Sequence, residues 1–175
     1  IIGSIIGSLA GAIMAIKVPM TGMPQMVGLL NGFGGGASTL VAISEYFRKN
    51  PNYPVDTGAA FILPVDQGIA IVLSLLIGGV TFTGSMIAFG KLQGLVTGKV
   101  VKYPLQHPIN LLLLLVVLAA GTYVVINPSL INLIFLITAI SLVLGVLLVL
   151  PIGGADMPVA ISLLNSYSGL AGSTT

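Results

Sequence analysis

The sequence predicts an all-α membrane protein, a polytopic bundle of about six transmembrane helices. Hydrophobic residues make up 56% of the 175 residues, and the mean hydropathy is +1.14. Charged residues make up only 6%, whereas a soluble domain carries about 25%. This composition excludes a soluble domain and a disordered chain. Because the chain has no cysteine and a net charge of only +2, it also excludes thiolate metal sites, disulfide scaffolds and a basic nucleic-acid-binding surface.

The few charged residues separate the apolar runs from one another. The charge-free stretches cover residues 1–16, 18–44, 67–90, 103–155 and 157–175, and a spanning helix needs about 20 apolar residues. Asn127-Pro128-Ser129 predicts a tight turn inside the longest run, and Pro51, Pro54 and Pro64 mark another loop. No segment alternates with the period of barrel strands. We therefore expect helices over residues 1–16, 25–47, 65–90, 109–126, 130–150 and 157–175.

The Lys and Arg residues of the short loops predict the orientation of this bundle. The loops after the first, third and fifth helices contain four basic residues, Lys17, Lys91, Lys99 and Lys102. The loops after the second and fourth helices contain two, Arg48 and Lys49. The four-to-two excess places the first group, together with the loop at Asp156, on the cytoplasmic side. The second and sixth helices then both begin at the cytoplasm.

An internal repeat links these two helices. Residues 23–35 read MPQMVGLLNGFGG and residues 157–169 read MPVAISLLNSYSG, with six of thirteen positions identical. Membrane translocators are often built from repeats, with the functional site where the copies meet. The alternative is that Met-Pro only starts a helix and Leu-Leu only faces lipid, but this leaves the paired Asn31 and Asn165 unexplained. The repeat therefore favours a shared site.

Three polar residues reach similar depths from the predicted cytoplasmic face. At 1.5 Å per helical residue, Asn31 lies about 12 Å, Asn165 about 13 Å and Ser85 about 9 Å into the bilayer. An amide in hydrocarbon is costly unless it has a partner, so we expect these side chains to face one another, water or another chain. One alternative is a purely structural role, since Asn and Ser commonly bond across membrane helices. Asp156 has two interpretations as well, either an N-cap of the last helix or an accessible entry or docking residue.

The order of these motifs resembles the membrane domain of the beta subunit of proton-translocating NAD(P) transhydrogenase. The resemblance is carried by GGADMP at 153–158 with LLNSYSG at 163–169, by TFTGS at 81–85 with AFGKL at 88–92, and by Met-Thr at 20–21 with Met-Pro at 23–24. It covers nearly the whole chain, and its first and last motifs are quite specific.

The resemblance implies that residues 1–175 are a fragment of a proton-translocating transmembrane domain in a bacterial inner membrane. In this family hydride passes from NADH to NADP+ in soluble domains, which hold the NAD(H) and NADP(H), and inward proton movement is coupled to it. The chain itself would hold no nucleotide, no metal and no catalytic residue. The expected partners are membrane lipid, the soluble domains and an alpha-type membrane chain, in a dimer of the whole assembly.

The resemblance also assigns roles to individual residues. Asn165 matches an Asn tied to proton translocation, Ser85 a Ser of the same path, and Asp156 an Asp that influences coupling to the NADP(H) domain. Asn31 stands where many members carry a proton-relaying His, and an amide cannot titrate near neutral pH. Either water carries the proton at Asn31 or, as we favour, a partner chain supplies a His. The alternative functions are a transporter or channel subunit for a small solute and a structural assembly subunit.

Overall fold

The computed structural model describes residues 1–50 and 61–172, and all regular structure in these residues is helical. Its helices are α1 (Ile2–Lys17), α2 (Met23–Lys49), α3 (Val65–Leu92), α4 (Gln106–Ile126), α5 (Ile131–Val149) and α6 (Met157–Gly172), with short 3₁₀ turns η1 (Met20–Gly22) and η2 (Gly154–Asp156). The all-α prediction is confirmed, and each predicted helix is present with ends moved by a few residues. Pro51 and Pro54 of the predicted loop, and residues 173–175 of the last predicted helix, lie outside the described residues.

Four of the six helices are long and apolar enough to cross a membrane. These are α2 with η1, α3, α4 and α5. The described residues of α1 and of α6 number 16 in each helix, about 24 Å at 1.5 Å per residue. The prediction of a polytopic helix bundle is thus confirmed.

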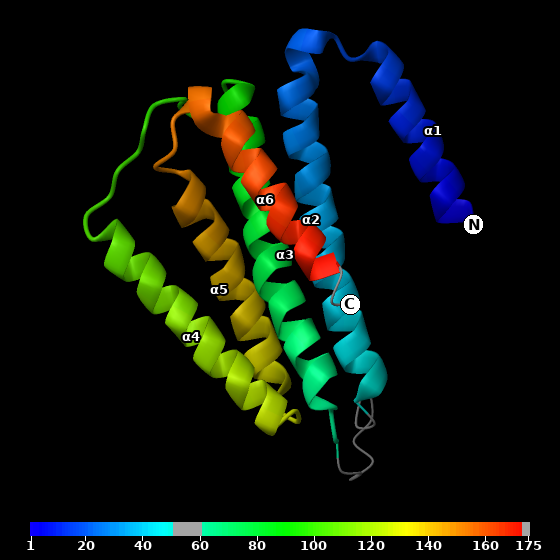
Figure 1. Cartoon of the computed structure of the whole chain (residues 1–175), viewed down its shortest axis with the longest axis vertical. Helices are drawn as coiled ribbons and strands as arrows, with labels where there is room; N and C mark the ends of the chain where they lie inside the picture. Colours follow the sequence, from blue (N-terminus) through cyan, green and yellow to red (C-terminus); the bar gives the residue numbers. More distant parts are fainter. Residues whose placement is uncertain (51–60, 173–175) are drawn as a thin grey trace.

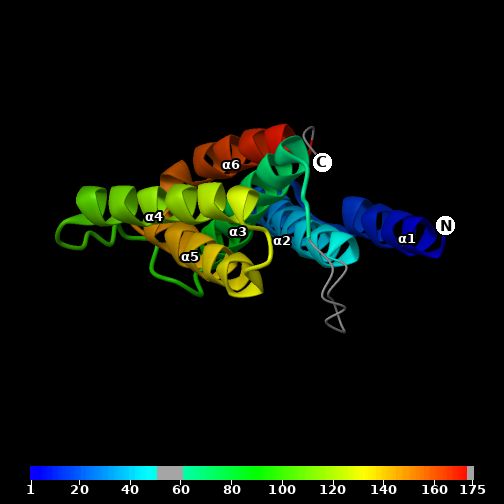
Figure 2. The same cartoon turned by 90° about the horizontal axis from the view of Figure 1, so that it is seen from below.

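Helix α3 is the centre of the bundle. It packs against α2, α4, α5 and α6, and α6 crosses one face of the bundle while α1 lies outermost, beyond α2 (Figures 1 and 2). None of the residues of α1 is buried. Since an apolar helix with no buried face is stable in lipid or against another chain, the isolated position of α1 agrees with a membrane-embedded protein.

Glycines let the neighbours of α3 approach it closely. A Cβ placed on Gly35 of α2 would lie 2.8 Å from the Gly78 carbonyl oxygen, the Phe82 nitrogen and the Thr81 Cβ. A Cβ on Gly145 of α5 would lie 2.5 Å from the Val80 carbonyl oxygen. These distances are far below normal contact, so only glycine permits this separation of the backbones. Small residues at helix interfaces are typical of membrane bundles, where backbone packing replaces the hydrophobic effect between helices.

The two copies of the repeat share the same local structure. Each is preceded by a 3₁₀ turn, η1 or η2, which runs directly into an α-helix at Met23 or Met157. A proline follows as the second helical residue in each copy. Its missing N–H costs nothing there, because the N–H groups of the first turn have no acceptor within the helix. Both helices begin at the same end of the bundle (Figure 1). The structure therefore confirms a parallel repeat.

A buried tyrosine joins the other end of α2 to the turn between α4 and α5. The Tyr46 side chain is fully buried, and its hydroxyl donates a hydrogen bond to the Pro128 carbonyl. Its ring also makes an edge-on contact with Phe61, with centroids 5.5 Å apart. The predicted turn at Asn127-Pro128-Ser129 is confirmed, because α4 ends at Ile126 and α5 begins at Ile131.

This hydrogen bond provides a test of the packing. We expect Tyr46→Phe to lower the free energy of unfolding by about 1–3 kcal/mol, because the buried Pro128 carbonyl loses its donor. Thermal unfolding of the purified protein in detergent measures the change. Tyr123→Phe is the matched control, since Tyr123 is 50% exposed and this variant should lose almost no stability. Equal melting temperatures for the two variants would contradict the assigned role of Tyr46.

Candidate functional site

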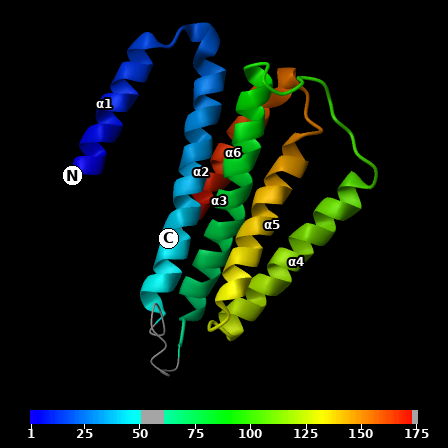
Figure 3. The same ribbon diagram turned by 180° about the vertical axis from the view of Figure 1, so that it is seen from behind.

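Two of the three predicted pathway residues meet in the bundle. The Asn31 side-chain nitrogen donates to the Ser85 hydroxyl oxygen at 2.9 Å, and both side chains are buried. Asn31 lies on α2 and Ser85 on α3, helices that run in opposite directions (Figure 3). The prediction that these two polar groups converge is confirmed.

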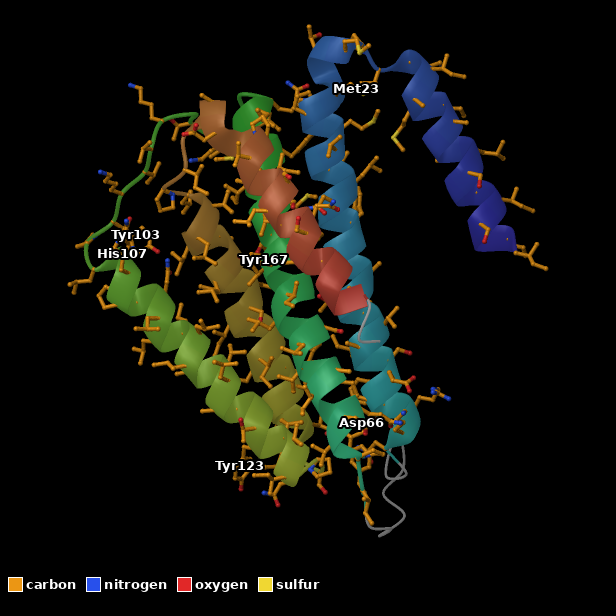
Figure 4. The ribbon with its side chains drawn as sticks, in the orientation of Figure 1. Met23, Asp66, Tyr103, His107, Tyr123 and Tyr167 are labelled. Carbon is orange, nitrogen blue, oxygen red and sulfur yellow. The ribbon has the colours of Figure 1, made fainter. Side chains whose placement is uncertain are left out.

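The Asn31–Ser85 pair lies between a side-chain hydrogen bond on one side and a close backbone crossing on the other. Toward η1, the Gln25 side chain donates to the Leu92 carbonyl at 3.0 Å. Toward the opposite end lies the close crossing of Gly35 and Gly78. The buried amide is therefore nearer to the end of the bundle at Met23 than to the end at Asp66, which Figure 4 marks at opposite ends of the α2–α3 pair.

Asn165 does not join this pair. It is exposed on α6, as are Ser162 and Ser166, whereas Ile161 and Leu164 form the buried face of that helix. Two of the three polar residues therefore face one another, and Asn165 is directed away from the interior of this chain, where water or another chain can meet it. Its depth matched that of Asn31, but its position around the helix axis did not. A polar stripe on the outer face of a membrane helix requires a partner of its own.

Asp156 is exposed at the end of η2, immediately before α6. Its backbone N–H donates to the Gly153 carbonyl at 3.0 Å. An N-cap carboxylate would accept from backbone N–H groups in the first turn of α6. Among the described residues the Asp156 carboxylate accepts no hydrogen bond, so the structure does not support the N-cap interpretation. The carboxylate is accessible from outside the chain, as a docking residue would require.

The sequence analysis missed a buried lysine close to this turn. Lys91, counted there only as a loop charge, is 4% exposed at the end of α3. Its ammonium group donates to the carbonyls of Leu150 at 2.6 Å, Ile152 at 2.7 Å and Lys99 at 3.3 Å. The one available signal was its position directly after an uninterrupted apolar helix, which does not distinguish a buried lysine from an exposed one.

Comparison with known proteins places the whole chain in one family. The family model for the NAD(P) transhydrogenase beta subunit matches residues 1–175. The NAD(P) transhydrogenase subunit beta of Rhodospirillum rubrum is 42% identical over 166 residues, which are 95% of this chain and 35% of that protein. The same subunit from R. rubrum strain ATCC 11170 gives the same values. The chain thus spans about a third of the length of these curated relatives. From the match over all its residues, together with the helical bundle described above, the chain belongs to the NAD(P) transhydrogenase beta subunit family.

Proposed function

We propose that this chain is the proton-conducting membrane part of a proton-translocating NAD(P) transhydrogenase. Hydride transfer from NADH to NADP+ takes place in soluble domains of the complex, and the chain holds no nucleotide itself. The observation that carries the proposal is the buried Asn31–Ser85 hydrogen bond between two membrane-spanning helices of a chain in this family. The family assignment favours this function over that of a solute transporter.

Asn31, Ser85 and Asn165 orient water or a partner's side chain and do not themselves titrate. Neither an amide nor a hydroxyl changes charge near neutral pH, so a proton passing them must reside on water or on another group. Ser162, Asn165 and Ser166 form an exposed polar stripe on α6, which favours a helix of an alpha-type chain bearing a His. The path would then run between that helix and the Asn31–Ser85 pair.

The end of the bundle that carries Asp156 faces the cytoplasm in this proposal. Lys17, Lys91, Lys99 and Lys102 belong to that end, and Arg48 and Lys49 to the other, in agreement with the excess of basic residues on the cytoplasmic side of bacterial inner-membrane proteins. The NADP(H) domain docks near Asp156, and the whole complex works as a dimer. If protonation of the path alters this docking, the redox state of NADP(H) must alter proton affinity in return, because coupling between two sites is reciprocal.

The function is tested by a double variant in the reconstituted complex. We expect Ser85→Ala with Asn165→Leu to lower proton movement coupled to hydride transfer by more than about tenfold, equivalent to about 1.4 kcal/mol in the barrier. Proton movement into vesicles and nucleotide reduction are followed together. Ser141→Ala is the matched control, since the Ser141 hydroxyl is also buried but donates at 2.7 Å to the Ile137 carbonyl of its own helix.

The outcome separates the alternative functions. A structural assembly role predicts lower stability with unchanged proton movement, and a solute transporter predicts flux that does not depend on nucleotide. Full coupled pumping by the double variant, at the level of Ser141→Ala, would refute the assignment of these residues to the path.

A further inference from the structure

The Lys91 ammonium group is buried without an acidic partner. Its side chain is 4% exposed, and the ion pairs of the described residues all involve Glu45, at the far end of the bundle. An ammonium group has three N–H donors, and here three backbone carbonyls accept from it. A buried charge is costly unless it is fully hydrogen-bonded. The three carbonyls meet this requirement, so the fold holds the Lys91 ammonium group in one defined position.

The three carbonyls belong to two separate segments. Leu150 and Ile152 follow the C-terminal end of α5, where unpaired carbonyls carry the negative end of the helix dipole. Lys99 belongs to the loop between α3 and α4. Lys91 therefore neutralises the end of α5 and at the same time holds the α3–α4 loop against the linker that leads to α6. Figure 3 shows both segments at the same end of the bundle.

Backbone hydrogen bonds join the same two segments. The Gly154 N–H donates to the Gly98 carbonyl at 2.8 Å, and the Val101 N–H donates to the Leu150 carbonyl at 3.3 Å. The α3–α4 loop and the α5–α6 linker thus form one layer, and Lys91 is the side chain of α3 that enters it. Asp156 lies two residues beyond Gly154, in η2.

Exposed lysines of the same loop behave differently. Lys99 and Lys102 are exposed, as expected for lysines that keep the charged group in water at a membrane surface. Lys91 turns its ammonium group inward onto carbonyls. A role as a simple membrane anchor does not explain this, because an anchor needs no internal acceptors.

We propose that Lys91 is a positioning residue that transmits changes at the Asn31–Ser85 pair to the turn bearing Asp156. The inference rests on the proposed function of the chain in coupled proton transfer. Ser85 lies six residues before Lys91 on the same helix, about 9 Å along its axis. Any rotation or shift of α3 that accompanies a change at Ser85 therefore moves the ammonium group, and with it the linker that leads to Asp156.

The test uses Lys91→Met in the complete reconstituted complex, with Lys99→Met as the matched control. Both variants lose one positive charge from the same end of the bundle, but the second keeps the Lys99 carbonyl and the Lys91 ammonium group. We expect Lys91→Met to speed hydrogen exchange at the Val101 and Gly154 amides by about tenfold or more. We also expect the number of protons moved per hydride to fall by at least about fivefold. Lys99→Met should match the wild type in both measurements.

If Lys91→Met does not assemble, the same amide exchange is measured in Lys91→Arg and in the unmodified complex. Arginine retains the charge, but its planar fork cannot aim at three carbonyls as an ammonium group does, so intermediate exchange and coupling are expected. In the unmodified complex, exchange at Gly154 should differ between the NADP+ and NADPH states. Equal exchange in these two states would overturn the inference.

Two further results would also overturn it. One is unchanged amide exchange in the Lys91 variants, and the other is faster exchange with an unchanged proton-to-hydride ratio. Failure of the proposed function is a separate result, because the wild type and Lys99→Met would then move no protons during hydride transfer.

Discussion

Asn31→Leu is expected to lower proton-coupled hydride transfer by at least about tenfold while leaving the complex assembled. Leucine has the branched shape of asparagine but cannot donate to the Ser85 hydroxyl, which Asn31 reaches at 2.9 Å. The expected effect on stability is small, because hydrogen bonds between membrane helices contribute only about 0.6 kcal/mol on average. The expected effect on coupled transfer is at least about tenfold, because the path loses its buried amide.

These two magnitudes distinguish a pathway residue from a residue that only holds helices together. The coupled rate is measured in proteoliposomes, and the unfolding temperature is measured in detergent on the same preparation. A variant that melts several degrees lower yet pumps normally would show that the Asn31–Ser85 bond is only a helix–helix contact.

Asn31→His is the informative companion variant. An imidazole can take up and release a proton, whereas the native amide does not titrate. We expect this variant to retain coupling and to gain a pH dependence of the coupled rate that the wild type lacks. A pH profile identical to that of the wild type would mean that the side chain at position 31 does not contact the moving proton.

Gly35→Ala is expected to produce the largest loss of stability among single-methyl changes in α2. The added methyl would lie 2.8 Å from the Gly78 carbonyl oxygen and the Phe82 nitrogen, and these backbone atoms cannot move away without separating the two helices. Overpacking of this kind costs about 1–3 kcal/mol. It outweighs the roughly 1 kcal/mol by which alanine favours a helix over glycine. Thermal unfolding of the complex in detergent measures the difference.

Gly34→Ala is the matched control for this prediction. Gly34 precedes Gly35 in the same helix, and apart from its own stretch of helix no atom of the described residues lies within 4 Å of the position that its Cβ would take. Both variants gain the same helix propensity, so the difference between them isolates the contact with α3. Equal melting temperatures would contradict the close α2–α3 crossing. Separation of α2 from α3 would also lengthen the Asn31–Ser85 bond, so Gly35→Ala should lose coupling as well.

The helices were predictable from sequence because the bilayer imposes a simple constraint. An apolar run must satisfy its backbone hydrogen bonds internally, and the few charges of this chain interrupt those runs at the ends of the helices. The structure moves these ends by only a few residues; α2 begins at Met23 and α4 at Gln106. The repeat was equally visible, because its two copies share the Met-Pro start that the 3₁₀ turns precede.

The candidate site was predictable in depth but not in direction. Counting residues from the membrane face gave Asn31, Ser85 and Asn165 similar depths, since the rise per residue of a helix is constant. Which side of each helix faces inward depends on its neighbours. For α6 these neighbours bury Ile161 and Leu164 and leave Asn165 outside.

The sequence by itself determined that this chain is embedded in a membrane, where its helices lie and how deep its polar residues reach, because hydropathy and helical rise are local properties. Only the tertiary structure decided that Asn31 meets Ser85, that Asn165 faces away and that Lys91 is buried. The acceptors of Lys91 include carbonyls 59 and 61 residues further along the chain. A backbone carbonyl is the same in every residue, so no sequence pattern marks it as the partner of a distant lysine.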